Sequence, residues 1–191
     1  MLFRLDDYLF HLLYAGGPGG SRALTLAAVV LSAIGEGRMM LAILPLAILP
    51  AWRRFAAWLT GTLALTGILV FVLKAMIGRG RPFTVYEGLR RELLDSPTDH
   101  SFPSGHAAGS FAFAFFVSQV ILARRPRPRF AVPSVIALVL LASGVAVSRV
   151  VLGFHFPLDV LAGAVLGTAV GTAAGGRYVR KTAIATEASA F

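Results

Sequence analysis

The chain has 191 residues, of which 57% are hydrophobic and only 14% are charged. Soluble domains carry about 25% charged residues, so the composition excludes an ordinary soluble domain and predicts a membrane protein. The net charge of +9 would suit nucleic acid, but the cations fall between apolar runs and form no continuous basic face, so we expect no nucleic-acid partner. The lack of cysteine excludes disulfides and thiolate sites and leaves the redox compartment open.

The N-terminal segment, residues 2–14, is predicted to form a short amphipathic helix. Four leucines recur at helical spacing from Leu2 to Leu12, and the polar residues lie elsewhere on the wheel. This pattern is typical of a helix that lies at the membrane interface. Two aspartates stand where a secretory signal would carry its basic region, so we expect no cleaved signal peptide.

Six apolar runs follow, at about 22–35, 38–51, 55–77, 105–123, 131–152 and 157–175. A bilayer-spanning helix needs about 20 residues, with a range of about 17 to 25, so the last four qualify and the first two are short. Fusing the first two would place the charges and glycines of GEGR, at 35–38, in the middle of a span, so we predict a tight hairpin there. The predicted fold is all-α: a single membrane-embedded domain, residues 1–191, with six transmembrane helices in a bundle and an N-terminal interfacial helix.

The distribution of arginine predicts the orientation of this bundle. Six spans put both termini on one side, together with the arginines at 53–54, 124–129 and 177–180. The positive-inside rule makes that side cytoplasmic. We therefore expect an integral protein of a bacterial inner membrane, with the opposite face toward the periplasm or exterior.

Two further features concern packing. The segment 78–103 is the only long polar connection, and we expect it to cap a site. In the last span, glycines recur every four residues and predict a smooth stripe for close helix packing: Gly163, Gly167, Gly171 and Gly175. Packing inside the bundle is the preferred interpretation and a homodimer seam is the alternative, so the oligomeric state, monomer or homodimer, stays open.

The first polar cluster flanks the end of the third span. It contains Lys74 and Arg81, and Pro82 is expected to stop the helix. Basic residues at the end of a span are ordinarily interfacial anchors, and Arg79 is interpreted in that way. Asp99 and His100 are expected to do no more than line the entrance.

The second polar cluster is Pro103-Ser104-Gly105-His106, directly before a long apolar helix. Ser104 is predicted to be the N-cap of that helix, and the free backbone N–H groups of a helix start form an anion site. Taken alone, the motif fits a plain capped helix start equally well.

The third polar cluster runs from Ser148 to Asp159. His155 and Asp159 are four residues apart at a helix start. A carboxylate near one imidazole nitrogen would fix the tautomer and stabilise the imidazolium, leaving the other nitrogen to attack. Arg149, at the end of the preceding span, comes close to His155 through a short turn.

The three clusters together supply a lysine, two arginines, two histidines and a carboxylate. This set predicts a site that binds a phosphate and attacks it with an imidazole. Two histidines and an aspartate could instead hold zinc with a vacant position. Three cations at the same place would repel a divalent ion, so metal-assisted hydrolysis is the alternative and no metal is expected.

The pattern as a whole resembles the signature of the type 2 phosphatidic acid phosphatase superfamily. That signature is Lys, six residues, Arg-Pro; then Pro-Ser-Gly-His; then Ser-Arg, five residues, His, three residues, Asp. Every internal spacing is kept here, and the resemblance covers about residues 55–175.

The resemblance implies a role for each matching residue. His155 would attack phosphorus to give a phosphohistidine, Asp159 would orient it, and His106 would act as general acid and then as general base. It also implies independence from metal and from any other cofactor. The phosphate oxygens would be held by Lys74, Arg81, Ser104, Gly105, Ser148 and Arg149.

The expected function is removal of a terminal phosphate from a lipid phosphate or diphosphate whose tail stays among the membrane lipids. The candidates are a polyprenyl diphosphate, phosphatidylglycerol phosphate, phosphatidic acid and a lipid A phosphate, and the sequence does not separate them. Two alternatives stay open. One is a lipid phosphotransferase, or a phosphatase of soluble esters, from the same superfamily. The other is a non-enzymatic transporter or lipid-binding protein, which would explain intramembrane cations but not a His–Asp pair.

Overall fold

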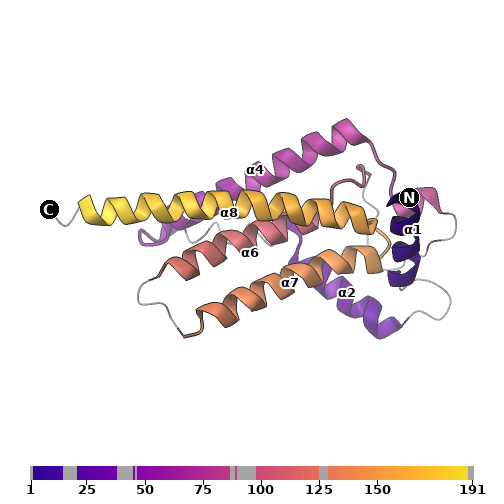
Figure 1. Ribbon diagram of the computed structural model, residues 1–191, viewed down its shortest axis with the longest axis horizontal. Coiled ribbons are helices and arrows are strands. Elements are labelled where there is room, and N and C mark those ends of the chain that lie inside the picture. Colours follow the sequence, from indigo (N-terminus) through magenta and orange to yellow (C-terminus); the bar gives the residue numbers. More distant parts are fainter. Residues whose placement is uncertain are drawn as a thin grey trace.

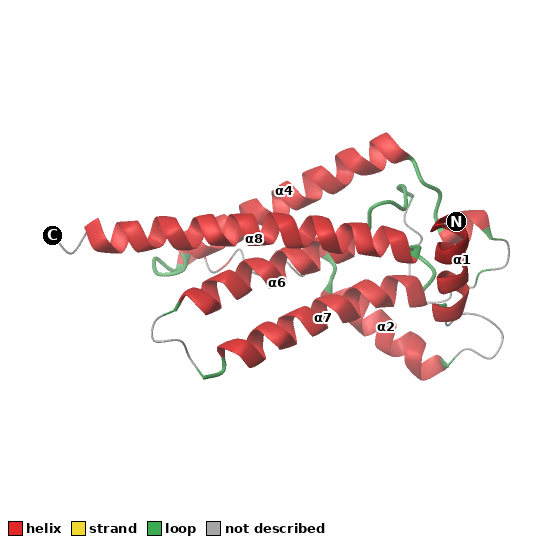
Figure 2. Ribbon diagram, viewed as in Figure 1, coloured by secondary structure: helices red, strands yellow, loops and turns green. Residues whose placement is uncertain are grey.

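The described part of the computed structural model is helical and contains no strand (Figure 2). It comprises residues 2–14, 21–37, 45, 47–86, 89, 98–124 and 129–188. Its helices are α1 (Leu2–Leu13), α2 (Arg22–Ile34), α4 (Arg53–Ile77), α5 (Pro82–Val85), α6 (Gly105–Ala123), α7 (Ala131–Val151) and α8 (Pro157–Ala188). The predicted all-α fold class is confirmed.

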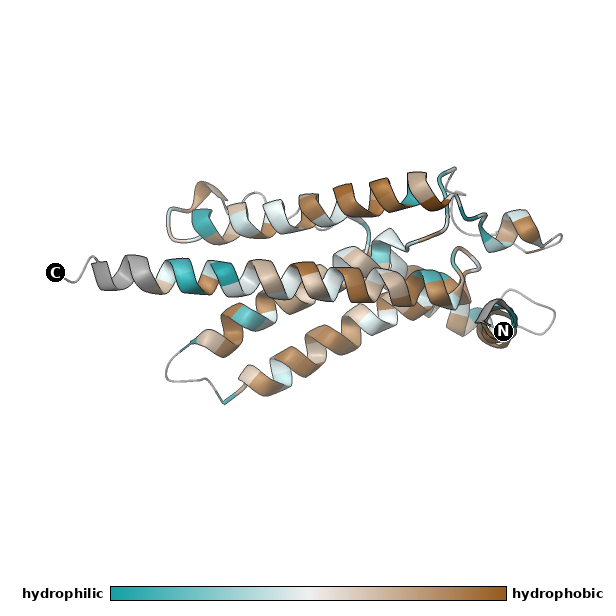
Figure 3. Ribbon diagram, turned by 45° about the horizontal axis from the view of Figure 1, so that its top comes forward, coloured by the Kyte–Doolittle hydropathy of each residue, from teal (hydrophilic) through white to brown (hydrophobic). Residues whose placement is uncertain are grey.

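Among the described residues, four helices are long and apolar enough to cross a bilayer, namely α4, α6, α7 and α8. Hydrophobic residues cover much of the length of α4 and α7, and hydrophilic residues gather toward helix ends and connections (Figure 3). Helix α2 is apolar but has only 13 residues, fewer than the roughly 17 that a full span needs. The last four predicted spans are thus present, and most of the predicted span 38–51 lies outside the described residues.

Helix α1 and the C-terminal end of α8 lie at opposite ends of the bundle (Figure 1). At the α1 end, Asp6 accepts a hydrogen bond from the backbone N–H of Leu158, at the start of α8. At the other end, the ring of Phe55, near the start of α4, lies 6.1 Å from the ring of Tyr178, late in α8. The chain therefore passes from one end of the bundle to the other between α1 and α4.

This path contradicts the predicted hairpin at 35–38 and the placing of both termini on one side, and the count of six spans is not confirmed. The end of α2 lies inside the bundle, where a Cβ on Gly35 would come 2.2 Å from Cγ1 of Val145 in α7. The glycine allows two helices to approach closely and does not mark a surface turn. The carboxylate of Glu36 lies within electrostatic range of Arg149, near the candidate site.

The glycine stripe of α8 packs against α6. A Cβ on Gly163, Gly167 or Gly171 would lie only 2.1 to 2.4 Å from a backbone oxygen of the facing helix. No side chain fits at such a distance, so glycine is what lets these two helices touch along their backbones. Packing inside the bundle is confirmed, and this stripe is not available as a homodimer seam.

Helix α1 occupies the predicted range and lies across the end of the bundle (Figure 1). Asp6 and Phe10, one helical turn apart, are fully buried against the bundle, whereas Leu5, Tyr8 and Leu12 are exposed. The exposed apolar side agrees with a helix that rests on a membrane surface. Burial of Asp6 was not predicted, because no partner for its carboxylate is visible in the sequence.

Helix α4 ends at Ile77 and is capped by Gly78, which adopts a left-handed conformation with φ of 64°. Glycine takes this conformation without steric cost and commonly ends helices in this way. Pro82, predicted to stop the helix, instead begins the short helix α5. Residues 79–81 therefore lie between these two helices and lead the chain to the candidate site.

Candidate active site

Lys74 and Arg81 meet on one carboxylate. In the last turn of α4, Lys74 donates to Oδ2 of Asp99 at 2.7 Å, and Arg81 Nη2 donates to Oδ1 at 2.6 Å. Lys74 also donates to the carbonyl of His100, and Arg81 Nε donates to the carbonyl of Asp99 at 2.8 Å. Both cations are buried while the side chain of Asp99 is 56% exposed. The segment predicted to cap the site therefore supplies part of it, and Asp99 does more than line an entrance.

His155 lies in a tight turn between α7 and α8. Gly153 opens this turn with φ of 75°, a value that favours glycine. The backbone N–H groups of Phe154 and His155 then both donate to the carbonyl of Arg149, at 3.0 and 3.2 Å. This turn carries His155 back over the end of α7, beside the Arg149 side chain, as the sequence spacing predicted.

The surroundings of His155 select one tautomer. Arg81 Nη1 lies 3.3 Å from Nε2 of the buried imidazole and also donates to the carbonyl of Phe154 at 2.9 Å. A guanidinium can donate but cannot accept, so Nε2 carries the lone pair and the proton sits on Nδ1. Nε2 is thus the nitrogen that can act as a nucleophile, and it lies on the side of the cations.

Asp159 approaches the other side of the ring, but not by a direct hydrogen bond. Its Oδ2 is 3.7 Å from Nδ1 of His155, beyond hydrogen-bonding distance. The hydroxyl of Ser101 lies between them: it donates to Oδ2 of Asp159 and is 3.4 Å from Nδ1. The predicted His–Asp pair is therefore present with a serine bridging it, and no sequence motif pointed to Ser101.

The start of α6 faces this pair. Ser104 is the N-cap, as predicted, and its hydroxyl accepts from the backbone N–H of Ala107 at 3.5 Å. Its own N–H donates to the carbonyl of Asp159 at 2.9 Å, which ties the starts of α6 and α8 together. His106, in the first turn of α6, is half-buried and lies within electrostatic range of His155 and Arg149. The two imidazoles are thus at the same end of the bundle.

Arg149 completes the cation group from α7. Its Nη1 donates to the hydroxyl of Ser32 in α2, and its guanidinium lies 4.4 Å from the ring centre of Phe154. Its Nε is buried and finds no hydrogen-bond partner among the described residues. A buried charged donor without an acceptor is costly, which is expected where an anion supplies the acceptor. The neighbouring Ser148 donates within its own helix, to the carbonyl of Val145 at 2.7 Å.

Burial and charge set the protonation of the groups outside the spans. Burial lowers the pKa of His155 to about 4, assisted by the charges of Arg81 and Arg149 and opposed by Asp159. Burial pushes the pKa of Asp99 upward, but hydrogen bonds from Lys74 and Arg81 outweigh it and bring that pKa to about 2. At neutral pH the imidazole is therefore neutral and the carboxylate ionised.

Metal ligands do not gather in the described part of the chain, where no group of three His, Cys, Asp or Glu side chains has the arrangement to hold an ion. Three of the described carboxylates are instead bound to lysine or arginine: Asp6, Asp99 and Asp159. The expectation of metal independence stays a prediction.

Comparison with known proteins decides the family. The model of the PAP2 superfamily matches residues 55–181. A decaprenylphosphoryl-5-phosphoribose phosphatase of Mycobacterium tuberculosis is 33% identical over 147 residues, which are 74% of this chain and 73% of the relative. The chain belongs to the PAP2 superfamily. This confirms the family indicated by the three sequence clusters.

Other PAP2 proteins extend the comparison. A lipid A 1-phosphatase of Rhizobium etli is 32% identical over 121 residues, 58% of this chain and 45% of the relative. The crystal structure of a transmembrane PAP2-type phosphatidylglycerolphosphate phosphatase from Bacillus subtilis superimposes with a TM-score of 0.75 at 22% identity, covering 92% of this chain and 85% of that one. The fold is thus that of a membrane PAP2 protein. With four helices of bilayer length, this chain is an integral membrane protein of a hydrolase family.

Sequence reasoning missed Arg79, which it interpreted as an anchor. The side chain is 19% exposed and bridges two carboxylates: Nη1 donates to Asp159 at 2.6 Å and Nη2 donates to Asp6 at 2.5 Å. One available signal was scarcity, because the chain has only nine acidic residues and two of them, Asp6 and Asp7, stand side by side in the segment 2–14.

Proposed function

We propose that this PAP2 protein hydrolyses the terminal phosphate of a membrane lipid phosphate or diphosphate, with His155 as the nucleophile. The observation that carries the proposal is that Arg81 lies 3.3 Å from Nε2 of His155, while Lys74, Arg81, Arg149 and His155 all lie within electrostatic range of His106. Three cations would bind the phosphate oxygens and stabilise the charge that develops on them in the transition state.

In the first step, Nε2 of His155 attacks phosphorus and the bond from phosphorus to the leaving oxygen breaks. His106 gives its proton to that oxygen. The attacking ring becomes a phosphorylated imidazolium, whose charge Asp159 stabilises through the hydroxyl of Ser101. Ser104 and Gly105, at the start of α6, would present hydroxyl and backbone N–H groups to the phosphate.

In the second step, His106 takes a proton from water as the oxygen attacks phosphorus. The bond from phosphorus to Nε2 of His155 breaks, inorganic phosphate leaves, and both imidazoles return to their starting protonation. Every proton is accounted for by the two histidines. Ser148 is proposed to help hold the phosphate, although its hydroxyl already donates within α7.

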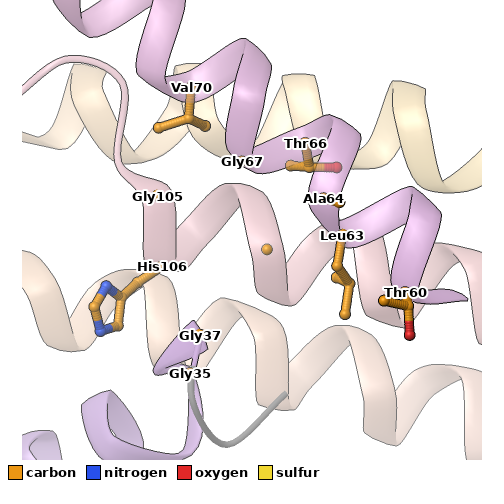
Figure 4. A pocket seen from close by; sticks show the side chains of 11 residues that line it. Gly35, Gly37, Thr60, Leu63, Ala64, Thr66, Gly67, Val70, Gly105 and His106 are labelled. Atoms are coloured by element: carbon orange, nitrogen blue, oxygen red, sulfur yellow. The ribbon is translucent and has the colours of Figure 1, made fainter. Parts of the chain in front are cut away.

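A lipid substrate is supported by a cavity of about 340 Å³ that opens beside His106. The cavity lies between α4 and α6 and runs along α4 toward the middle of the bundle, past Gly67 and Leu63 to Thr60 (Figure 4). Glycine and apolar side chains make most of its wall. A headgroup at His106 would place an apolar tail in this cavity, which suits a lipid better than a soluble ester.

The proposed membrane and orientation of the protein rest on its family and on the distribution of its arginines. Arg53 begins α4 and Arg124 follows α6, and these two helix ends lie at the end of the bundle remote from α1 (Figure 1). Basic residues at that end favour a site facing the periplasm or exterior of a bacterial inner membrane. The relatives named for decaprenylphosphoryl-5-phosphoribose and lipid A substrates support lipid phosphates as a class. They do not select one headgroup.

The test is a phosphate-release panel on the purified, full-length protein, with polyprenyl diphosphate, phosphatidylglycerol phosphate, phosphatidic acid and lipid A as substrates. Wild type should release phosphate from at least one lipid with water as sole acceptor, and folded H155A and H106A should release none. Wild-type turnover by either variant would contradict the assigned roles. Release that requires a second lipid as acceptor would identify a phosphotransferase instead.

The cavity is tested with two glycine variants of α4. A side chain at Gly67 projects into open space and would fill the cavity, whereas Gly61 also has open space but does not line it. Gly67→Leu should lower kcat/KM for long-chain lipids and leave a short-chain phosphate ester unaffected, while Gly61→Leu should change neither. Equal losses on long and short substrates would mean that the cavity does not hold the tail.

A further inference from the structure

Arg79 connects the interfacial helix α1 to the pair formed by His155 and Asp159. Arg79 lies between Asp159 of α8 and Asp6 of α1, at 2.6 and 2.5 Å. Both carboxylates are fully buried, with side-chain exposures of 0%. Buried carboxylates must be compensated by charge and hydrogen bonds, so neither can move without disturbing the guanidinium. The two ends of this bridge are 153 residues apart in sequence, at 6 and 159.

Asp6 also holds the start of α8 directly. Its Oδ1 accepts from the backbone N–H of Leu158 at 2.8 Å, one of the free N–H groups of the first turn. A carboxylate at that position is favoured by the helix dipole as well. Asp6 therefore fixes both the helix turn that carries Asp159 and the cation that binds it.

The opposite oxygen of Asp159 faces the imidazole. Oδ2 accepts from the hydroxyl of Ser101 and from the backbone N–H of Phe156 at 2.9 Å. Because the ring of His155 contacts Asp159 through Ser101, the orientation of the imidazole depends on where the carboxylate stands. Arg79 on one oxygen, and Ser101 and the N–H of Phe156 on the other, hold the carboxylate in that position.

Helix α1 contacts the nucleophile turn at a second point. A Cβ on Gly153 would lie 2.9 Å from the ring of Tyr14, just beyond the end of α1. The ring of Phe10 stacks on Tyr86 and packs against Phe156, at centroid distances of 5.9 and 5.4 Å. Helix α1 and the residue that follows it therefore contact the turn that carries His155 on both sides, at Gly153 and at Phe156.

We propose that Asp6 is a positioning residue for His155, acting through Arg79 and Asp159, so that the interfacial helix α1 is a working part of the active site. Asp6 touches no reacting atom in this scheme. The inference rests on the proposed function, in which His155 attacks phosphorus. It adds a residue outside the three sequence clusters and outside the region 55–181 that the family model matches.

The proposed role predicts that two variants of the bridge shift the pKa of His155 in opposite directions. The bridge holds two carboxylates and one guanidinium, a net charge of −1. Asp6→Asn leaves Arg79 and Asp159 with a net charge of 0, whereas Arg79→Gln leaves two carboxylates with a net charge of −2. The imidazole of His155 should therefore lose its proton at lower pH in the first variant and at higher pH in the second.

Several other charges face His155 and are unchanged in these variants. Arg81, Arg149 and His106 act on it from the segment before α5, from α7 and from α6, and Asp159 acts from α8. Lys74 and Asp99 lie one contact further away, through Arg81. Because both variants keep this set, a difference between them reports the bridge.

The experiment uses the full-length protein with a short-chain lipid phosphate, and compares D6N, R79Q and the double variant with D7N as control. Asparagine at position 6 keeps an oxygen for the N–H of Leu158, so α1 stays docked. Asp7 is exposed and accepts a hydrogen bond from the hydroxyl of Tyr86 at 2.7 Å, whereas Asp6 binds Arg79. Thermal unfolding checks the fold, and R79K keeps a cation at the centre if R79Q does not fold.

We expect D6N to lower kcat by about tenfold, the order seen when an orienting partner is removed, with KM unchanged. The acidic limb of kcat/KM should move to lower pH in D6N and to higher pH in R79Q. The double variant should lose little more than the worse single variant, because both act on one bridge. D7N should match wild type.

Wild-type kcat and pH profile in D6N would overturn the inference, as would shifts of D6N and R79Q in the same direction. H155A separates this failure from failure of the proposed function. If H155A is inactive while D6N behaves as wild type, only the role of Asp6 is wrong. If H155A keeps activity, the proposed function itself is wrong.

Discussion

Substitution of Asp99 should tighten phosphate binding, although the residue lies inside the site. Its carboxylate holds Lys74 and Arg81, the two cations that a phosphate would use, at 2.7 and 2.6 Å. A phosphate that binds both must first displace it. The side chain is 56% exposed, so it can swing away, and Asp99→Asn removes the charge while keeping the shape.

The size of the effect follows from these two contacts. Exposed ion pairs are worth about 0.2 to 1 kcal/mol each, and a value near the middle of this range suits a half-exposed carboxylate. Roughly 1 kcal/mol for the two together corresponds to about a fivefold change in affinity. Because hydrogen bonds from Lys74 and Arg81 keep the pKa of Asp99 at about 2 despite burial, the carboxylate is ionised at every working pH and the effect should not fade on mild acidification.

The assay is the competitive inhibition constant of inorganic phosphate at neutral pH and low salt, measured for wild type, Asp99→Asn and Asp7→Asn. The constant should fall by about fivefold in Asp99→Asn and stay unchanged in Asp7→Asn, which removes an exposed charge that bonds Tyr86 and not Lys74 or Arg81. A constant that is unchanged or higher in Asp99→Asn would show that Asp99 holds the cations in place and does not compete with phosphate.

Three further predictions concern protonation, packing and metal. Burial lowers the pKa of His155 to about 4, so the imidazole stays neutral down to that pH. As the pH is lowered, kcat/KM, corrected for titration of the substrate phosphate, should therefore fall with a midpoint near pH 4. A midpoint at the ordinary value of about 6.5 would contradict the burial argument. Gly167→Ala places a Cβ 2.1 Å from the carbonyl oxygen of Ala108 and should destabilise the protein by about 1 to 3 kcal/mol, seen as a lower Tm. The control Gly176→Ala has open space around it and should keep the wild-type Tm. Equal Tm values for the two variants would mean that α6 and α8 are not in backbone contact. Treatment with a chelator should leave turnover intact, whereas loss that zinc restores would favour metal-assisted hydrolysis.

Much of the site was predictable because its chemistry lies in short-range patterns. Ser104 precedes an apolar run and caps its helix, and the turn between Arg149 and His155 is short enough to force them together. The glycine stripe of α8 predicted close packing because its period of four residues keeps it on one face. Local spacing decides each of these features.

The features that were missed depend on contacts between distant segments. Asp6 contacts Arg79 across 73 residues of sequence, and Ser101 contacts Asp159 across 58. No local sequence pattern therefore predicts either contact. The hairpin prediction failed for a related reason. Glycine and charge at 35–38 were interpreted as a surface turn, but Gly35 is small so that α2 can approach Val145, and Glu36 lies near Arg149.

The central claim is a covalent bond between phosphorus and His155, and it can be observed directly. The full-length protein would be mixed with a lipid phosphate labelled on the terminal phosphate, quenched in base and digested for mass spectrometry. The label should appear on the peptide containing His155 and be absent from H155A. Label on another residue, or turnover without any phosphorylated histidine in a quench fast enough to catch it, would contradict the account.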